Sequence, residues 1–371
     1  MDLDHLKKPA FLIDRAKVRR NVERMAEKAG RSGVSLRPHV KTHQSAGVAA
    51  WLRDYDVRAI TVSSVDMAAY FQRSGWSDIL ISVPVNIHQI PDIDELAAAA
   101  SLDVIVESPA AARALVRGIR QPLDVWIEVD TGYHRTGVPV GETDTILDVA
   151  KALGASRYLR LRGLLCHDGQ TYAASGPAEV LEIAEGSFRA LSSAVAELET
   201  AGLQGLSLSV GDTPSCSLLD SFSRPVSEIR PGNFVFYDLT QAGVGACREE
   251  EIAAVVACPV IAKYPARGEI VIYGGGVHIS KESLTPPEGG PCFGRITRLR
   301  GAEGFWPAPL EDAYVSSLSQ EQGIVKAPEA LCDSVEIGET IAVYPVHACL
   351  TANLHPAYCV PGEGWLPKFR L

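Results

Sequence analysis

Over the first 245 residues, two patterns of apolar positions alternate along the chain. Short runs rich in β-branched residues predict strands, and stretches with an apolar residue at every third or fourth position, such as Glu179–Glu199, predict helices. Ser108-Pro109 and Gly141-Glu142 have the residue types that begin helices. The predicted strands are Ser35–Thr42, Ala59–Ser64, Asp78–Val85, Leu102–Ser108, Leu123–Asp130, Leu159–His167, Leu206–Gly211 and Ile229–Asp238.

Eight strands that alternate with helices indicate an α/β fold, and specifically a (β/α)8 barrel of the TIM type. A doubly wound open sheet is the alternative topology. Such a sheet usually carries a glycine-rich dinucleotide-binding turn after its first strand. No such turn follows Phe11–Asp14 or Ser35–Thr42.

Beyond about residue 245 the helical pattern ends, and strand-like runs are separated by turns rich in glycine and proline. We therefore predict a barrel domain over residues 15–245 and an all-β domain made of residues 1–14 and 246–371. The second domain would include the short strand Ala10–Ile13. Its other predicted strands are Glu251–Lys263, Gly268–Ile279, Ala313–Ser317 and Ile341–Val346.

The composition is that of an ordinary globular protein. Of 371 residues, 46% are hydrophobic, 22% are charged and 7% are aromatic, which excludes a disordered or fibrous chain. The formal net charge is −10, and lysine and arginine form no run, so we expect no nucleic-acid partner. A local basic site for one small phosphate is still allowed.

The chain also lacks the marks of export. Its first 20 residues carry several charges, which argues against a secretory signal, and no apolar run approaches the roughly 20 residues that cross a bilayer. The 8 cysteines are scattered without a C-x-x-C pair, as is typical of reduced thiols. We expect a cytoplasmic protein without a membrane partner.

The densest group of titratable residues is the segment Arg37–His43, with the sequence RPHVKTH. In an extended strand, His39, Lys41 and His43 would share one face. They would lie at the carboxyl end of the first barrel strand, where barrel active sites form. A lysine among such neighbours would have its ammonium form disfavoured and could form an imine. A solvated basic loop is the alternative interpretation.

Polar turns follow four of the predicted barrel strands. Ser209–Ser215 and Arg230–Asn233, after strands seven and eight, offer backbone N–H groups and hydroxyls where barrels frequently bind phosphate. After strands five and six, the turns could offer Arg135 to an anion and Tyr172 to a flat ring. The turn that contains Arg135 could also be an ordinary surface turn.

A third candidate is the segment His347-Ala348-Cys349 near the C-terminus. On an extended segment, the imidazole and the thiol would point the same way and could share one metal ion. A nitrogen–sulfur pair favours zinc over manganese or magnesium. Two protein ligands would leave positions for water or substrate, as a catalytic site requires. His355 and Cys359 are possible additional ligands.

These features occur together in one known family. The sequence resembles the D-threonine aldolase and D-serine dehydratase group of fold-type III pyridoxal-phosphate enzymes, which combine an alanine-racemase-like barrel with a β domain. The resemblance runs from about residue 9 to residue 360, in the family's order. The matching segments read PAFLIDRAKVRRNV, RPHVKTH, VDTGYHRTGV, CHDGQTY, SVGDTPS, EIRPGNFVFYD and HACLTANLHPAY.

The resemblance implies a role for each matching residue. Lys41 would form the imine with pyridoxal 5'-phosphate, with His39 and His43 beside it in the catalytic segment. His347 and Cys349 would bind a divalent metal. Members of this family are commonly head-to-tail homodimers, with the active site near the subunit interface. The other residues implied to bind the cofactor are Arg135, His167, Tyr172, Gly211, Asp212, Thr213, Gly232, Asn233 and Tyr237.

The resemblance further implies a lyase that acts on β-hydroxy-D-amino acids. If a base, for which Lys41 is our choice, removes the Cα proton, the metal-bound hydroxide leaves and a dehydratase results, giving a keto acid and ammonia. If the β-hydroxyl is deprotonated instead, retro-aldol cleavage yields glycine and an aldehyde. Dehydratases of the family tend to carry cysteine at the position of Cys349, where aldolases carry aspartate, so dehydration is favoured. An amino-acid racemase and a non-catalytic cofactor carrier are the remaining alternatives.

Three positions depart from the family's pattern. Asp212 puts an anion into the phosphate turn, so we expect its side chain to face away from the phosphate. The segment YGGGVHISKE replaces the usual aspartate-containing strand, and Gln322 stands where a histidine is frequent. These departures concern the exact substrate more than the class of enzyme.

Overall fold

The computed structural model describes residues 6–223, 225–285, 289–299 and 306–370. The described chain forms two compact units. The β unit comprises the residues up to Val22 together with Thr42–Trp51 and Asn233–Arg370, and the barrel unit comprises Glu23–Lys41 and Leu52–Gly232. The helices α1 (Arg15–Ser32) and α2 (Ala46–Leu52) each contribute residues to both units.

The barrel unit is built on a parallel sheet whose strands follow the order β2-β10-β9-β8-β6-β5-β4-β3. A parallel bridge between His39, shortly after β2, and Thr61 of β3 closes this order into a circle. The (β/α)8 prediction is therefore confirmed for the described residues. The strands are β2 (Ser35–Leu36), β3 (Ile60–Val62), β4 (Asp78–Pro84), β5 (Ser101–Val106), β6 (Leu123–Asp130), β8 (Leu159–Leu165), β9 (Ser207–Val210) and β10 (Val226–Ile229), with β7 (Val138–Pro139) paired to β6.

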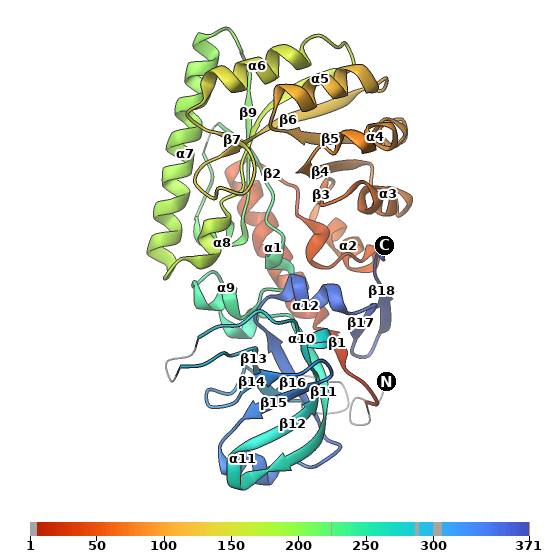
Figure 1. Ribbon diagram of the computed structural model, residues 1–371, viewed down its shortest axis with the longest axis vertical. Coiled ribbons are helices and arrows are strands. Elements are labelled where there is room, and N and C mark those ends of the chain that lie inside the picture. The colour runs from red at the N-terminus through yellow and green to blue at the C-terminus, as the bar shows by residue number, and fades with distance from the viewer. Residues whose placement is uncertain (1–5, 224, 286–288, 300–305, 371) are drawn as a thin grey trace. The chain divides into compact units, whose positions relative to one another are not determined.

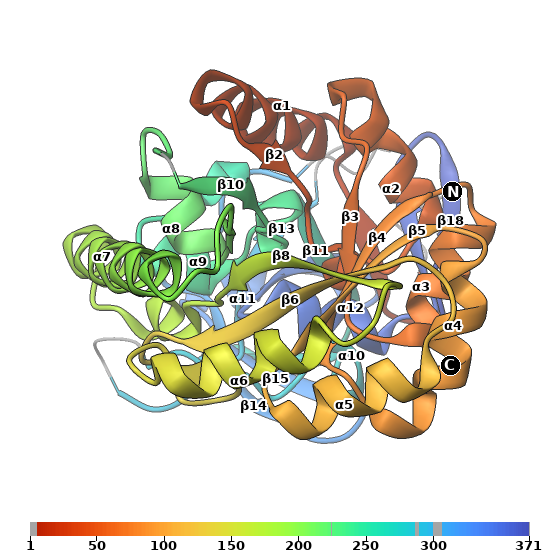
Figure 2. The same cartoon turned by 90° about the horizontal axis from the view of Figure 1, so that it is seen from above.

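Helices alternate with these strands and lie around the outside of the sheet, as Figure 2 shows from above. Strands such as β5 and β6 are buried along nearly their whole length, because helices cover them. Ser108 caps α5 by accepting the N–H of Ala111 at 3.2 Å, as its position before a proline predicts. The helices are α3 (Val65–Arg73), α4 (Ile90–Ala97), α5 (Pro109–Gly118), α6 (Thr143–Leu153), α7 (Pro177–Thr200) and α8 (Thr213–Leu218).

Two predicted barrel strands are wrong in extent. The first was expected to run to Thr42, but β2 ends at Leu36, and the 3-10 turn η2 (Val40–Thr42) follows Pro38. The last was expected over Ile229–Asp238, but β10 ends at Ile229. Proline removes a backbone N–H from the ladder in both segments, so the chain leaves the sheet early. After β10 the proline is Pro231, and Gly232 follows it in the turn.

The β unit contains a sheet that is antiparallel except for the parallel pair β1–β17, and it also closes on itself because β12 pairs with both β11 and β15. The N-terminal strand β1 joins it between β11 and β17, as expected for Ala10–Ile13. Phe11 of β1 is fully buried, with its ring centroid 5.1 Å from that of Tyr358. The strands are β1 (Ala10–Ile13), β11 (Ala254–Tyr264), β12 (Glu269–Tyr273), β13 (Gly294–Arg298), β14 (Tyr314–Leu318), β15 (Gln322–Lys326), β16 (Thr340–Pro345), β17 (Ala357–Val360) and β18 (Gly364–Pro367) (Figure 1).

The prediction that this region is built mainly of strands is confirmed, although the sequence pattern missed β13, β15, β17 and β18. The strand expected over Gly268–Ile279 ends at Tyr273, because a run of three glycines interrupts it before α10. Short helices connect the strands: α9 (Leu239–Gly243), α10 (Gly276–Ile279), α11 (Glu329–Ser334) and α12 (Ala348–Leu354).

All 8 cysteines lie in described segments, and each is a free thiol. Over residues 6–370, apart from the undescribed gaps, no helix is both long enough and apolar enough to span a membrane.

Candidate active site

Lys41 lies in the tight turn η2 and not on an extended strand. His39 is buried, and its Nδ1 accepts the backbone N–H of Lys41 at 3.4 Å. Burial, followed by the nearby charge of Lys41, holds the pKa of His39 well below its usual value, so its ring is neutral. His39 therefore fixes the backbone beside Lys41 and supplies no neighbouring cation.

The expectation that His39, Lys41 and His43 share one face is wrong. His43 is fully buried in the β unit, where its Nδ1 accepts the backbone N–H of Ser45 at 3.1 Å. Its ring meets that of Phe236 edge-on, at 6.4 Å between centroids, and burial lowers its pKa to about 3. The period of two that the strand pattern assumed does not hold in a 3-10 turn.

Two turns of the barrel unit converge around Thr213, the first residue of α8. The N–H of Thr213 points at the hydroxyl of Tyr172 (3.2 Å), and its own hydroxyl accepts the N–H of Gly232 at 3.3 Å. A Cβ on Gly211 would lie 2.7 Å from the backbone nitrogen of Arg230, so only glycine permits this approach. The structure thus brings together three of the predicted phosphate-turn residues, Gly211, Thr213 and Gly232, with Tyr172 beside them.

The side chain of Asp212 makes its hydrogen bonds within the turn itself. Its carboxylate caps α8 by accepting the N–H of Ser215 at 2.7 Å, and it also accepts the hydroxyl of Thr171 at 2.8 Å. Burial, reinforced by the neighbouring Asp168, raises the pKa of Asp212 to about 7. Its side chain therefore shapes the turn.

His167 lies at the end of β8, where its Nδ1 donates to the carbonyl of Gly211 at 2.6 Å. Burial, followed by the charge of Lys41, lowers the pKa of His167 to about 3, so the ring is neutral. Tyr133 meets the His167 ring edge-on, at 5.8 Å between centroids. The exposed guanidinium of Arg135 stacks over Tyr133 at 5.2 Å, where it is free to meet an anion.

Arg230 is a buried cation beneath these turns that our candidate set did not contain. Its Nε donates to the hydroxyl of Ser209 at 2.6 Å, and its Nη2 donates to the carbonyls of Cys166 and Ser209. Ser209 in turn donates to the carboxylate of Glu228 at 2.6 Å. The ends of β8, β9 and β10 are thereby held in register under the phosphate turns.

His347 and Cys349 meet at the start of α12, although not on the extended segment we expected. β16 ends at Pro345, and His347 is the N-cap residue of α12. Burial alone would lower the pKa of His347. The negative charge of Cys349, the hydrogen bond between Cys349 and His347, and the charge of Asp238 outweigh the effect of burial and raise this pKa to about 9. An imidazole beside a thiol is a nitrogen–sulfur donor pair that a divalent cation can occupy once both groups have lost their protons.

Asp238 is a fully buried carboxylate beside this pair, 4.0 Å from Nδ1 of His347. Its Oδ2 accepts the N–H of Ala348 at 2.8 Å, and its Oδ1 accepts the N–H of Gln241 at 2.9 Å. Metal-binding histidines usually have such an acceptor behind them. The sequence pattern does not point to this role, because it places Asp238 at the end of a predicted strand.

The sulfur of Cys349 has two further neighbours. The hydroxyl of Thr42 lies 3.2 Å from it, and Nδ2 of Asn233 lies 3.7 Å from it. The side chain of Asn233, which we expected to bind the cofactor phosphate, thus points to Cys349 and also donates to Asp238. Tyr237 is buried in the β unit with a left-handed φ of 52°, a conformation that is costly for a tyrosine.

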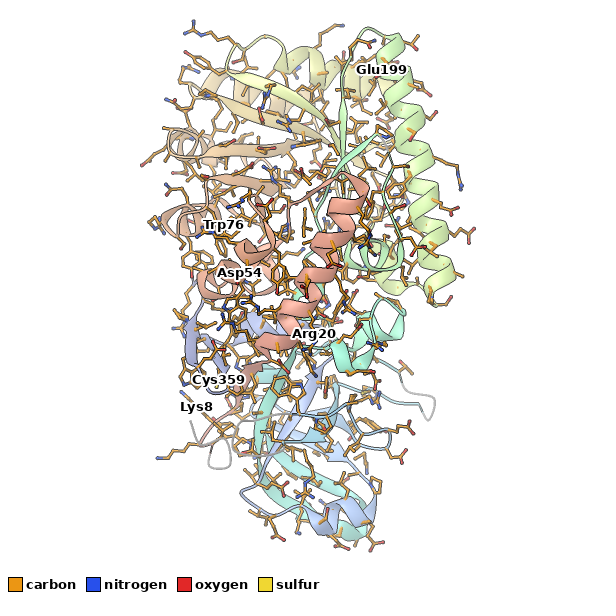
Figure 3. All side chains as sticks on the ribbon, turned by 180° about the vertical axis from the view of Figure 1, so that it is seen from behind. Lys8, Arg20, Asp54, Trp76, Glu199 and Cys359 are labelled. Atoms are coloured by element: carbon orange, nitrogen blue, oxygen red, sulfur yellow. The ribbon has the colours of Figure 1, made fainter. Side chains whose placement is uncertain are left out.

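His355 and Cys359 do not join this pair. Nε2 of His355 bonds the carbonyl of His278 at 2.8 Å, and Cys359, labelled in Figure 3, is buried on β17. Among the residues that the structure describes, no three histidine, cysteine or acidic side chains are grouped to hold a metal.

The donor sets fit the expected cofactor and metal. The N–H groups of Thr213 and Gly232, with the two hydroxyls beside them, suit a phosphate dianion. The His347–Cys349 pair suits a borderline-soft divalent ion such as zinc.

Comparisons with known proteins agree with this geometry. The family model of the alanine racemase N-terminal domain matches residues 13–239, and a model described as a putative serine dehydratase domain matches residues 253–361. D-threo-3-hydroxyaspartate dehydratase of Delftia sp. (strain HT23) is 32% identical over 94% of this chain and 93% of its own. D-serine dehydratase of Dictyostelium discoideum is 26% identical over 97% and 94%.

Solved structures share the fold over the whole chain. The Delftia sp. HT23 enzyme has a TM-score of 0.89 at 30% identity, covering 100% of this chain and 99% of that chain. D-threonine aldolase from Filomicrobium marinum has a TM-score of 0.85 at 24% identity, covering 99% and 96%. This chain belongs to the alanine-racemase-like family of fold-type III pyridoxal-phosphate enzymes, in the group that joins an alanine racemase N-terminal domain to a serine dehydratase domain.

Proposed function

We propose that the protein is a pyridoxal-phosphate- and metal-dependent lyase that dehydrates a β-hydroxy-D-amino acid, of the D-serine or 3-hydroxy-D-aspartate type. The products are a keto acid and ammonia. The observation that carries the proposal is the His347–Cys349 pair with the buried carboxylate of Asp238 beside it. Relatives named as dehydratases, which match nearly the whole chain, support it.

The residues of the barrel unit hold and orient the cofactor. Thr213, Gly232 and Tyr172 bind its phosphate, and Lys41 provides the amine that tethers its aldehyde. Bound pyridoxal phosphate supplies an electron sink for bonds broken at Cα of an amino acid. His167 is neutral, and its ring is held by the carbonyl of Gly211, so it offers no positive charge to the substrate carboxylate. The guanidinium of Arg135, stacked over Tyr133, can bind that carboxylate instead.

Lys41 also accepts the Cα proton in our proposal, because dehydration needs a base at that carbon. Thr42 follows Lys41 directly in the chain, and its hydroxyl lies 3.2 Å from the sulfur of Cys349. His347 and Cys349 would hold a divalent ion, zinc being favoured over manganese or magnesium. Such an ion supplies Lewis acidity for the leaving β-hydroxyl. One solved relative, a cysteine-to-alanine variant described as metal-free, supports a metal in this group of enzymes.

We further propose that the barrel domain spans residues 15–245 and that residues 1–14 and 246–371 form the domain with the metal pair. We also propose a homodimer. The dimer is supported by exposed apolar side chains on α10 and α12, which a second subunit would cover. These side chains are Val277, Leu350 and Leu354. Light scattering coupled to size-exclusion chromatography tests the dimer.

Product analysis tests the reaction. The purified protein, loaded with cofactor and zinc, is incubated with D-serine, D-threonine and D-threo-3-hydroxyaspartate. Ammonia and a keto acid in equal amounts support dehydration. Glycine and an aldehyde would establish the aldolase alternative, which the relative named D-threonine aldolase keeps open. Inversion without cleavage would establish a racemase, and the lack of any product from all three would leave a cofactor carrier.

A further inference from the structure

Two hydrogen-bond donors converge on the sulfur of Cys349, apart from His347. The hydroxyl of Thr42, whose side chain is fully buried, lies 3.2 Å away, and the amide nitrogen of Asn233 lies 3.7 Å away. Toward a thiolate, which is the form of cysteine that binds metals, both groups must act as donors. The sulfur therefore faces a small set of polar groups that the ligand role alone does not require.

Asn233 is held in this orientation by a buried carboxylate. One N–H of its amide donates to Oδ2 of Asp238, and the same nitrogen donates toward the sulfur. Asp238 is itself fixed by the backbone N–H groups of Ala348 and Gln241. The amide of Asn233 is therefore oriented toward the sulfur by contacts within the protein itself.

Hydrogen bonds to a thiolate withdraw charge from the sulfur and weaken its covalent donation to a metal. A weaker sulfur donor reduces the advantage of soft ions over hard ions at the same site. Building on the proposed metal role of Cys349, we propose that Thr42 and Asn233 are positioning residues that weaken sulfur donation by Cys349. They thereby broaden the site from zinc toward harder ions such as manganese.

Thr42 allows a clean test, because valine has nearly the same shape and lacks the hydroxyl. The holoenzyme is compared with Thr42→Val and with Thr42→Ser, which keeps the hydroxyl. Thr351→Val is the matched control: it removes another fully buried threonine hydroxyl from α12, one that donates to the carbonyl of Ile279 and not to the sulfur. Thr42→Ala replaces Thr42→Val if circular dichroism shows that the valine variant is unfolded.

Two readouts are independent of catalysis. The first is the sulfur-to-metal charge-transfer band of the cobalt(II)-substituted protein, and the second is the ratio of the dissociation constants for manganese and zinc. We expect Thr42→Val to move the band to lower energy and to raise the selectivity for zinc by about tenfold, the size of effect typical for residues behind a metal ligand. Thr42→Ser and Thr351→Val should keep the wild-type band.

The outcomes separate this inference from the proposed function. If wild-type protein shows no sulfur-to-cobalt band, Cys349 does not bind the metal, and both proposals fail. If the wild-type band is present but Thr42→Val and Thr351→Val give the same band and the same selectivity, the positioning role is overturned while the metal site stands.

Discussion

The carboxylate of Asp238 accepts the backbone N–H of Ala348 at 2.8 Å, which anchors the first turn of α12 between His347 and Cys349. We expect Asp238→Asn to lower zinc affinity by roughly 10- to 100-fold, because the amide loses the charge beside His347. Competition with a chromophoric chelator measures this affinity. Asp66→Asn, on the exposed surface of α3, serves as the control. Equal zinc affinity in both variants would contradict the role of Asp238.

Lys41 is the amine that our proposal assigns to the cofactor. We expect Lys41→Ala to abolish the visible absorbance of the cofactor imine, because no amine remains at that position to form it. Lys151→Ala, which removes an exposed lysine from α6, should retain the band. Borohydride reduction of the wild type followed by peptide mapping should label Lys41, and a label on another lysine would refute the assignment.

The sulfur of Cys349 should decide the choice of metal. Cys349→Asp replaces a soft donor by a hard one, so we expect preference to shift from zinc toward manganese. The matched control is Cys247→Asp, which places the same charge at another half-buried cysteine. The ratio of bound zinc to manganese, measured by elemental analysis after dialysis against both ions, reports the shift. An unchanged ratio in Cys349→Asp would remove Cys349 from the ligand set.

Arg37 and Asp103 form a buried ion pair at 2.9 Å, and Asp103 also accepts the indole N–H of Trp126 at 2.8 Å. Arg37 also faces the carboxylates of Asp78 and Glu228, so Asp103→Ala leaves its charge partly compensated, but the buried indole N–H of Trp126 loses its acceptor. We therefore expect Asp103→Ala to reduce the free energy of unfolding by about 1–3 kcal/mol. Denaturant unfolding measures the change. Asp103→Asn, which keeps an acceptor for the indole, should lose less, and an equal loss in both variants would show that the charge of Asp103 and not its hydrogen bond dominates.

Asp212 should make stability depend on pH. Burial raises its pKa from 3.8 to about 7 in the folded protein, so the folded state holds the proton more tightly than the unfolded state. Its favourable contribution is fully present below pH 4 and is lost as the pH rises through about 7. Asp212→Asn keeps the helix cap and removes the titration.

The advantage of Asp212→Asn over wild type should therefore grow between pH 4 and pH 8, by on the order of 2–4 kcal/mol. Urea unfolding at several pH values measures it. A difference between the two proteins that does not change with pH would show that Asp212 stays ionised when buried.

The alternation of strands and helices made most of the barrel predictable. Periodicity failed where proline and glycine interrupt a strand, after Pro38 and at Pro231-Gly232, because local apolar pattern does not reveal where a ladder hydrogen bond is missing. It also failed for edge strands such as β18 (Gly364–Pro367), whose side chains are half exposed and carry no clear pattern.

The site was partly predictable for a similar reason. Lys41, Thr213 and the His347–Cys349 pair stand in local motifs with recognisable chemistry. Thr42 and Asp238 do not, since their roles come from tertiary contacts with residues more than 100 positions away. A serine, threonine or aspartate can serve in many places, and only the fold shows which partner it meets.

The placement of β1 has a consequence for how the chain acquires its structure during synthesis. Phe11 pairs with Val256 on one side and with Tyr358 on the other, so β1 is synthesised long before either of its neighbours. Its apolar side chains must wait until β11 and β17 have emerged from the ribosome. Until then this short hydrophobic segment is a natural target for chaperones, and a protein that stalls late in translation would leave it exposed.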